Sequence, residues 1–224
     1  MGPATRKLSP RWTQLREQQE TAVARTIVEI VAGDPSGLTV AAIAQGAGVS
    51  RPTFYKRFPT VEAAIIYTQH RVLQDLGERV AVLLGRQGSE ALGLNGRERL
   101  LRVFEAMLEA FLNEPDMLHF LSFFDFSFRA RGMTDAQRAE HARLSAQASE
   151  NIEAMFRAGQ ADGSIDPELP VKVTARALGT SLLGAAQRLQ IQEELRAEPG
   201  DAIRDTYLSI IASWRVSLAP RRSL

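Results

Sequence analysis

A chain of 224 residues is long enough for one large domain or two small ones. Hydrophobic residues make up 45% of it and charged residues 24%, which is ordinary globular usage and excludes a fibrous or disordered chain. Without any cysteine, the sequence excludes disulfides, thiolate metal sites and cysteine nucleophiles. The three histidines, which lie far apart in the sequence, predict no metal site. No apolar run reaches the ~18 residues of a membrane span, and the first twenty residues lack the apolar stretch of a secretory signal, so we expect a cytoplasmic protein without a membrane partner.

The net charge of +1 conceals an uneven distribution. Residues 1–60 contain eight basic and four acidic residues, a charge of +4, whereas the remainder contains 19 basic and 22 acidic residues, a charge of −3. A basic N-terminal quarter on an acidic body is typical of a protein that contacts nucleic acid at one end. An excess of four charges is small, however, and by itself it also fits a chance distribution.

The pattern of apolar residues predicts helices throughout the N-terminal part and no strand. An amphipathic helix is expected over 12–32, where it ends at the Gly33–Gly37 stretch. Two short helices follow over 39–45 and 50–57. Pro59 ends the second of them, and Thr60 can cap a long helix from Val61 to about Leu84. The four glycines between 85 and 96 predict a linker.

The rest of the chain is also predicted to be helical. Apolar residues from Leu100 to Leu112 follow helical spacing. An aromatic-rich segment runs from Pro115 to about Gly132, and long helices are expected over 134–161, 170–191 and 201–218. We therefore predict an all-α fold of about nine helices. Its N-terminal three-helix head is the helix-turn-helix domain (1–60), a long connecting helix follows (61–84), and the helical body (97–224) is the ligand-binding and dimerisation domain.

The segment from Leu38 to Phe58 reads as a helix-turn-helix motif. Ala44 is small enough for a steep helix crossing, and Gly48 tolerates the positive φ that the turn needs. Ser50 can cap the second helix, and Pro52 fits only in its first turn. Four apolar positions are then expected to face inward: Ile43, Ala47, Val49 and Phe54.

This arrangement turns a polar and basic face outward. Its residues suit phosphate oxygens and base edges in a major groove: Ser50, Arg51, Thr53, Tyr55, Lys56 and Arg57. Thr39 stands at the N-terminus of the first short helix, where free N–H groups favour a phosphate. The alternative is an ordinary helical hairpin with a solvated basic face.

The run of residues from Ile43 through Ala47-Gly48-Val49-Ser50 and Thr53-Phe54-Tyr55 to Phe58-Pro59 resembles the DNA-binding head of the tetracycline-repressor (TetR) family of bacterial transcription regulators. The resemblance implies phosphate contacts from Thr39, Tyr55 and Lys56. It implies base or groove contacts from four consecutive residues: Ser50, Arg51, Pro52 and Thr53. The family commonly has a lysine where this chain has Val61, so one phosphate contact is in question. Arg57 or the arm residues Arg6, Lys7 and Arg11 can compensate.

Five of the ten phenylalanines lie within nine residues of the body, between Phe120 and Phe128. One helix face cannot cover all five, so some must face a core and others a cavity or a partner. The functional interpretation is a pocket for a small apolar or aromatic ligand. Its candidate lining is Phe104, Met107, Phe111, Phe120, Phe123, Phe124, Phe128 and Met155. The alternative is ordinary core packing.

The last two predicted helices, near 170–191 and 201–218, are rich in small residues that allow close helix approach. Two such helices from each subunit would form a four-helix homodimer interface, which the family resemblance also implies. A dimer is physically reasonable because a twofold pair of recognition helices reads two half-sites roughly 34–36 Å apart.

Together these features predict a ligand-responsive DNA-binding transcription regulator. We expect a repressor that binds a palindromic operator as a dimer and is released by a small apolar molecule. No cofactor, metal or catalytic residue is expected, because the sequence has no metal cluster, phosphate-binding loop or nucleophile elbow. The alternative is an all-helical enzyme or lipid-binding bundle whose head only resembles a DNA-binding domain.

Overall fold

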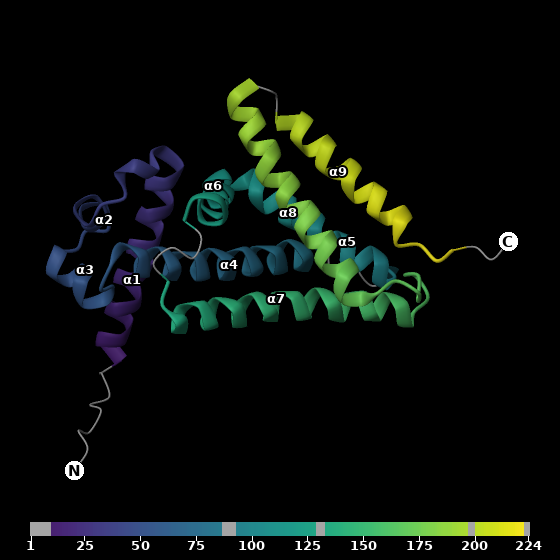
Figure 1. The fold of residues 1–224 in the computed structure, drawn as a ribbon, viewed down its shortest axis with the longest axis horizontal. Coiled ribbons are helices and arrows are strands. Elements are labelled where there is room, and N and C mark those ends of the chain that lie inside the picture. Colours follow the sequence, from purple (N-terminus) through teal and green to yellow (C-terminus); the bar gives the residue numbers. More distant parts are fainter. Residues whose placement is uncertain (1–9, 87–92, 129–132, 197–199, 222–224) are drawn as a thin grey trace, which may run out of the picture.

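The computed structural model describes residues 10–86, 93–128, 133–196 and 200–221. Within these ranges the chain is all-α, as predicted, with no strand and with α-helices α1 to α9 (Figure 1). The N-terminal helices are α1 (Pro10–Gly33), α2 (Val40–Gly46), α3 (Arg51–Arg57) and α4 (Val61–Arg86). The later helices are α5 (Gly96–Asn113), α6 (Pro115–Phe123), α7 (Asp135–Ala161), α8 (Val171–Arg196) and α9 (Gly200–Ser217). A short 3₁₀ turn, η1 (Pro35–Gly37), precedes α2, and a π-helical turn, η3 (Phe124–Phe128), follows α6.

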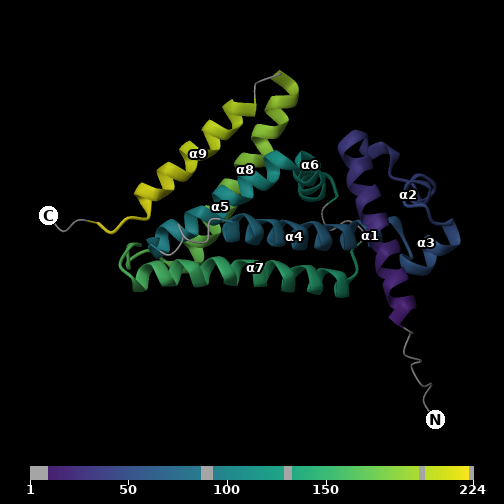
Figure 2. The ribbon, with the colours of Figure 1, turned by 180° about the vertical axis from the view of Figure 1, so that it is seen from behind.

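The helices form a small head and a larger body. Helices α1, α2 and α3 lie together at one end, and α4 leads from them into the body (Figure 1). Within the body, α5 packs against α4, α7 and α9, while α8 packs against α6, α7 and α9. Seen from behind, α9 lies on the side of the body away from α3, and α8 lies between α9 and α6 (Figure 2). Because α1 packs against both α4 and α6, the head rests directly on the body.

The predicted helix ends are close to those observed. Helix α7 begins directly after Thr134, as expected from the sequence. The Thr134 hydroxyl caps it by accepting the N–H of Gln137. The linker expected over 85–96 is shorter than predicted, because α4 continues to Arg86 and α5 already begins at Gly96. Asn95 caps α5 in a reciprocal arrangement with Glu98, a capping box that the sequence analysis did not identify.

A continuous hydrophobic core joins the head to α4. Ile27 of α1, Ile43 of α2 and Phe54 of α3 are completely buried. The ring of Phe58 lies between Phe54 and Tyr67, with ring centroids 5.7 Å and 5.3 Å apart. Since Tyr67 is in the second turn of α4, these aromatic contacts fix the head to the start of the connecting helix.

Helices α5 and α7 cross with almost no space between their backbones. A Cβ atom on Gly96 would lie 2.4 Å from the Cα atom of Gly159. Beside the crossing, the Asp162 carboxylate accepts the N–H of Gly96 at 2.6 Å, and the Ser164 hydroxyl accepts the N–H of Arg97 at 2.9 Å. Hydrogen bonds from Ser164 and then from Gly96 lower the pKa of Asp162. The C-terminal end of α7 thus clamps the first turn of α5.

Tyr207 of α9 is fully buried, and its hydroxyl has no hydrogen-bond partner among the described residues. Burial raises the pKa of this phenol. Because an unsatisfied buried hydroxyl costs about 1–3 kcal/mol, we expect Tyr207→Phe to leave the free energy of unfolding unchanged or to raise it. Urea unfolding of the two proteins measures the difference, and a clear loss of stability in the variant would contradict this account of the site.

Candidate DNA-binding interface

Helices α2 and α3 form the predicted helix-turn-helix. Gly48 has a φ of 65°, the left-handed conformation that the turn was expected to need. The Val49 N–H donates to the carbonyl of Ala44 at 2.9 Å, and the Gly48 N–H donates to that of Gln45 at 3.1 Å. Of the positions predicted to face inward, Ile43 and Phe54 are fully buried, and Ala47 and Val49 are half-buried. The interior of the motif is therefore as predicted.

Helix α2 also makes a close approach to α1 that the sequence did not reveal. A Cβ atom on Gly46 would lie 2.5 Å from Cγ2 of Thr26, a stiff β-branched side chain in the buried face of α1. Because Gly46 lies within helix α2 and not in the turn, the sequence alone showed no reason for a glycine at this position. The close contact holds α2, and with it the turn, against the long first helix.

The N-terminal end of α3 presents its polar groups to solvent. The Ser50 hydroxyl accepts the N–H of Thr53 at 3.2 Å and lies 2.9 Å from the Thr53 hydroxyl. Pro52 is in the first turn, and Arg51 and Pro52 are exposed. Thr53 is half-buried. The residues predicted to contact bases therefore gather at one helix end, with the Arg51 side chain accessible to a partner.

The residues predicted to contact phosphates lie on the same surface. Tyr55 is 54% exposed, and its ring meets that of Phe54 edge-on at 5.8 Å. Lys56 is exposed. The exposed Thr39 hydroxyl accepts the N–H of Ala42 at 3.2 Å, which leaves its own hydrogen to donate to a phosphate oxygen. Cationic and hydroxyl donors thus border the exposed start of α3.

Arg57 does not face outward, contrary to the orientation predicted for it. The residue is half-buried, and its guanidinium Nη2 donates to the Gln19 Oε1 of α1 at 3.2 Å. The reason is helical periodicity, because a residue three positions after the buried Phe54 lies on the same side of α3. Sequence reasoning had assigned no role to Gln19. A DNA contact from Arg57 stays a prediction, and its observed contact braces α3 against α1.

Two of the basic residues expected to replace the phosphate contact at Val61, Arg6 and Lys7, lie outside the described residues. The remaining arm residue, Arg11, is exposed in the first turn of α1. Val61 itself is half-buried at the start of α4, where the Thr60 hydroxyl accepts the N–H of Ala63 at 3.1 Å. The sequence had predicted this cap.

In the body, the eight candidate ligand residues are largely packed against one another and the core. Phe104, Phe111, Phe120 and Phe124 are buried, and the other four, Met107, Phe123, Phe128 and Met155, are half-buried. Four of the rings form a connected group around η3, in which Phe124 and Phe128 have centroids 5.4 Å apart. The π-helical turn therefore brings these four phenylalanine rings together, and they pack mainly against one another.

Two buried glutamines of α8 fasten that helix to the aromatic region. Gln187 donates to the Asp125 carboxylate at 3.0 Å, and Gln190 donates to the Pro115 carbonyl at 3.0 Å. The Gln190 amide nitrogen is also 2.8 Å from Nδ1 of His119. No sequence signal marked these pairs, because each joins residues more than sixty positions apart.

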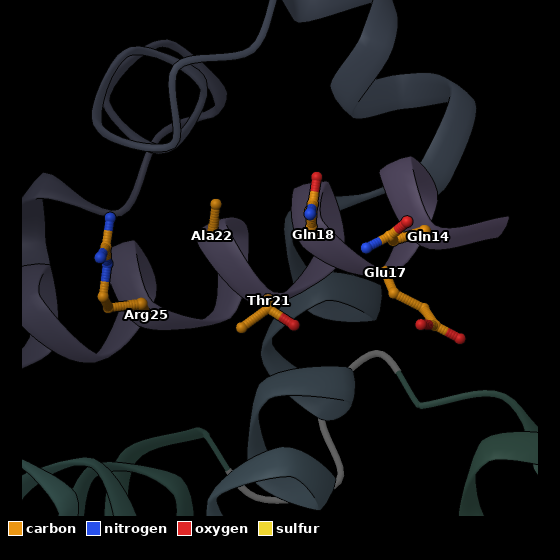
Figure 3. A pocket seen from close by; sticks show the side chains of 6 residues that line it. All are labelled: Gln14, Glu17, Gln18, Thr21, Ala22 and Arg25. Carbon is orange, nitrogen blue, oxygen red and sulfur yellow. The ribbon is translucent and has the colours of Figure 1, made fainter. Parts of the chain in front are cut away.

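Several hollows are open on the surface. Six residues along α1 line a shallow one: Gln14, Glu17, Gln18, Thr21, Ala22 and Arg25 (Figure 3). Because its lining comes from a single helix and five of its six residues are polar or charged, we do not regard it as a ligand site. A groove of about 540 Å³ lies where α1 and α4 meet the corner between α5 and α6. Arg79 of α4 forms a salt bridge there with Glu114.

The outer faces of α8 and α9 carry exposed apolar and small side chains. Val173 of α8 is 56% exposed and Val216 of α9 is 77% exposed. Ala177 and Gly184 of α8 and Ala212 of α9 are exposed as well. These are the helices in which the sequence predicted a homodimer interface.

Within the described ranges, no helix is long and apolar enough to span a membrane, and no group of three or more acidic or histidine side chains is arranged to hold a metal ion.

Comparison with known proteins agrees with the geometry of the head. Residues 24–63, which include all of α2 and α3, match the family described as bacterial regulatory proteins, tetR family. No curated protein matches this sequence significantly.

Solved structures match over nearly the whole chain. A TetR family transcription regulator from Marinobacter aquaeolei VT8 has a TM-score of 0.63 at 20% identity, covering 93% of this chain and 100% of that chain. The fatty acid degradation regulator FadR from Bacillus halodurans has a TM-score of 0.66 at 13% identity, covering 96% and 100%. The ketosteroid transcriptional regulator KstR2 of Mycobacterium tuberculosis has a TM-score of 0.57 at 16% identity, covering 96% and 98%. At these identities the likeness is one of fold.

Residues 24–63 of the head thus match the tetR family of bacterial regulatory proteins, and the whole chain has a fold like that of solved TetR-type transcription regulators. The comparisons support a DNA-binding regulator. These structures belong to transcription regulators and not to enzymes, so they give the enzyme alternative no support.

Proposed function

We propose that the protein is a cytoplasmic transcriptional repressor that binds a palindromic operator as a homodimer and is released by a small apolar molecule. The observation that carries the DNA-binding part is the exposed polar start of α3, backed by the buried Phe54. Arg51, with its side chain in solvent, suits bidentate contact with a guanine edge. Ser50, Pro52 and Thr53 are proposed to make the neighbouring base or groove contacts. Phosphates are proposed to meet Thr39, Tyr55 and Lys56.

The proposed dimer forms through α8 and α9 of each subunit. Apolar residues such as Val173 and Val216 are unfavourable when they are exposed to water on a surface that extends over two helices. A second copy of the chain would cover them. A single recognition helix reads only a few base pairs. A twofold dimer provides a second recognition helix and therefore reads a second half-site.

The proposed domains are the head (1–60), the connecting helix (61–84) and the ligand-binding and dimerisation body (97–224). Helix α4 contacts both parts. Tyr67 near its start packs on Phe58 of the head, and Arg79 further along pairs with Glu114 of the body. A ligand whose affinity for the body depends on the position of α4 would therefore favour one position of this helix. It would thereby change the distance between the two heads of the dimer. The proposed lining of the ligand site is the set of eight phenylalanines and methionines named above, from Phe104 to Met155.

A matched pair of alanine variants tests the proposed DNA contacts. Arg51→Ala is expected to lower affinity for the preferred sequence by about 1–3 kcal/mol while leaving binding to random DNA nearly unchanged. Lys56→Ala is expected to weaken binding to all sequences and to reduce the salt slope by about one ion. Titrations of labelled operator and random duplexes at several salt concentrations measure both effects.

Both residues are exposed, so neither change should disturb the fold, and thermal unfolding provides the control. Equal losses on operator and random DNA for Arg51→Ala would contradict its proposed role in reading bases. An unchanged salt slope for Lys56→Ala would contradict its proposed phosphate contact.

A further inference from the structure

A small hollow lies at the corner of the body where α4, α5 and α7 meet, and it has a volume of about 300 Å³. The surface that it presents is almost wholly apolar. Four half-buried side chains form its apolar wall: Leu84 of α4, Leu94 before α5, Val103 of α5 and Met155 of α7. Met155 is the only one of the eight predicted ligand residues in this lining, so the corner hollow is distinct from the predicted aromatic set.

The helices on either side of the hollow are held together without a ligand. Gly96 and Ala158 also line it, at the crossing where the backbones of α5 and α7 meet. The Asp162 carboxylate accepts the Gly96 N–H at 2.6 Å beside this crossing. The two small residues leave the space open, and the clamped crossing fixes its walls. A ligand therefore binds here without having to order the helices first.

Two arginines line the hollow, but their guanidinium groups are engaged elsewhere. Nη1 of Arg99 donates to the Leu94 carbonyl at 2.7 Å, and its Nη2 lies 3.6 Å from the Asp162 carboxylate. Nη1 of Arg102 donates to Glu105 at 2.9 Å. With the charged ends engaged, these side chains offer the hollow mainly their methylene stems. The arginines thus contribute apolar surface to the lining, in agreement with its overall character.

We propose that the corner hollow binds a compact, uncharged apolar molecule. The expected size is about ten to twelve non-hydrogen atoms, because a cavity of roughly 150 Å³ holds benzene and this hollow is about twice as large. An apolar molecule gains free energy by leaving water for such a wall. A charged ligand would lose its hydration there without a compensating partner.

The position and size of the hollow favour a small molecule over a protein partner. The lining comes from α4, α5 and α7, whereas the proposed dimer forms through α8 and α9, so the second copy leaves the hollow open. One turn of a helix, about 10 Å across and 5.4 Å long, fills roughly 400 Å³ and is too large to enter. The volume is at the lower end of the range for small-molecule sites.

The hollow is also placed to act on α4. Leu84 is in the last turns of this helix, whose 26 residues span about 39 Å, and Tyr67 near the other end contacts the head. A ligand against Leu84 therefore touches the connecting helix at the end opposite the DNA-binding motif (Figure 1). The effect of such a ligand on DNA rests on the proposed function, whereas its binding does not.

The test compares three probes that share one ring system: naphthalene, naphthoate and naphthylmethylammonium. Each is titrated into the full-length protein with isotope-labelled methionine methyl groups, and Met155→Leu identifies the signal of Met155. Naphthalene is expected to shift the Met155 methyl signal saturably and to bind at least tenfold more tightly than either charged probe. The Met107 signal is expected to stay unchanged, because Met107 belongs to the aromatic set and does not line the hollow.

A matched pair of variants locates the site on α7. Ala158→Phe fills the hollow from an exposed position and is expected to weaken naphthalene binding at least tenfold. Ala154→Phe makes the same change at an exposed position one turn earlier, outside the lining, and is expected to have no effect. Arg99→Met removes the charge and keeps an apolar stem, so naphthalene affinity is expected to stay within twofold. Thermal unfolding verifies that each variant is folded.

The proposal is overturned if naphthoate binds as tightly as naphthalene, if naphthalene shifts Met107 and not Met155, or if naphthalene does not bind saturably. A loss for Ala154→Phe as large as that for Ala158→Phe would also contradict it. Naphthalene binding that leaves operator affinity unchanged would support the corner hollow as a site and contradict the proposed release from DNA.

Discussion

Replacing Phe54 by alanine is expected to unfold the head and to abolish DNA binding. The side chain is fully buried in α3 and contacts the rings of Tyr55 and Phe58. Removing a buried phenylalanine costs about 3–5 kcal/mol, because both the apolar contacts and the packing around them are lost. A small three-helix unit has little stability in reserve. Chemical unfolding followed by circular dichroism, together with an operator titration, measures both consequences.

Tyr55→Ala is the matched control for this change, since it removes a neighbouring aromatic ring that is more than half exposed. It is expected to weaken DNA binding while leaving the unfolding free energy within about 1 kcal/mol of the wild type. If Phe54→Ala and Tyr55→Ala destabilised the protein equally, the assignment of inner and outer faces to α3 would be wrong.

Gly96→Ala is expected to destabilise the body by about 3 kcal/mol, at the upper end of the usual cost of overpacking. The added Cβ would lie 2.4 Å from the Cα atom and 2.5 Å from the nitrogen of Gly159, so backbone atoms and not a flexible side chain must move. Separation of the two helices would also stretch the hydrogen bond from the Gly96 N–H to Asp162. Thermal unfolding of the variant measures the loss.

Gly77→Ala provides the opposite expectation with the same chemical change. Gly77 is exposed in the interior of α4, and a Cβ atom there would meet nothing within 4 Å. Alanine is favoured over glycine in a helix by about 1 kcal/mol, so this variant is expected to be more stable than the wild type. A Gly96→Ala protein as stable as Gly77→Ala would contradict the close crossing of α5 and α7.

The local features of the fold were predictable from the sequence because they depend on neighbouring residues. Thr60 caps α4 as expected, α7 begins directly after Thr134 as expected, and Gly48 has the positive φ that its place in the turn requires. The buried and exposed faces of α2 and α3 also follow from helical periodicity. Arg57 was predicted to face outward, but the same periodicity places it on the side of Phe54, and its contact with Gln19 of α1 was not predictable from the motif.

Contacts between distant residues were not predictable in the same way. Nothing in the sequence shows that Gly96 lies against Gly159, or that Gln187 meets Asp125. The aromatic segment was expected to divide between a core and a cavity or partner, and the ring contacts that a π-helical turn creates within it were not predictable. Such arrangements depend on how whole helices pack, which a single sequence pattern does not specify.

Selection of bound sequences from a random pool of DNA duplexes, at fixed salt concentration, tests the central claim most directly. The proposed dimer and the exposed start of α3 predict enrichment of an inverted repeat whose half-sites are centred about one helical turn, or a multiple of it, apart. The same selection with Arg51→Ala should enrich a less defined sequence. Recovery of a pool without any enriched sequence would contradict the assignment of α3 as a DNA-reading helix.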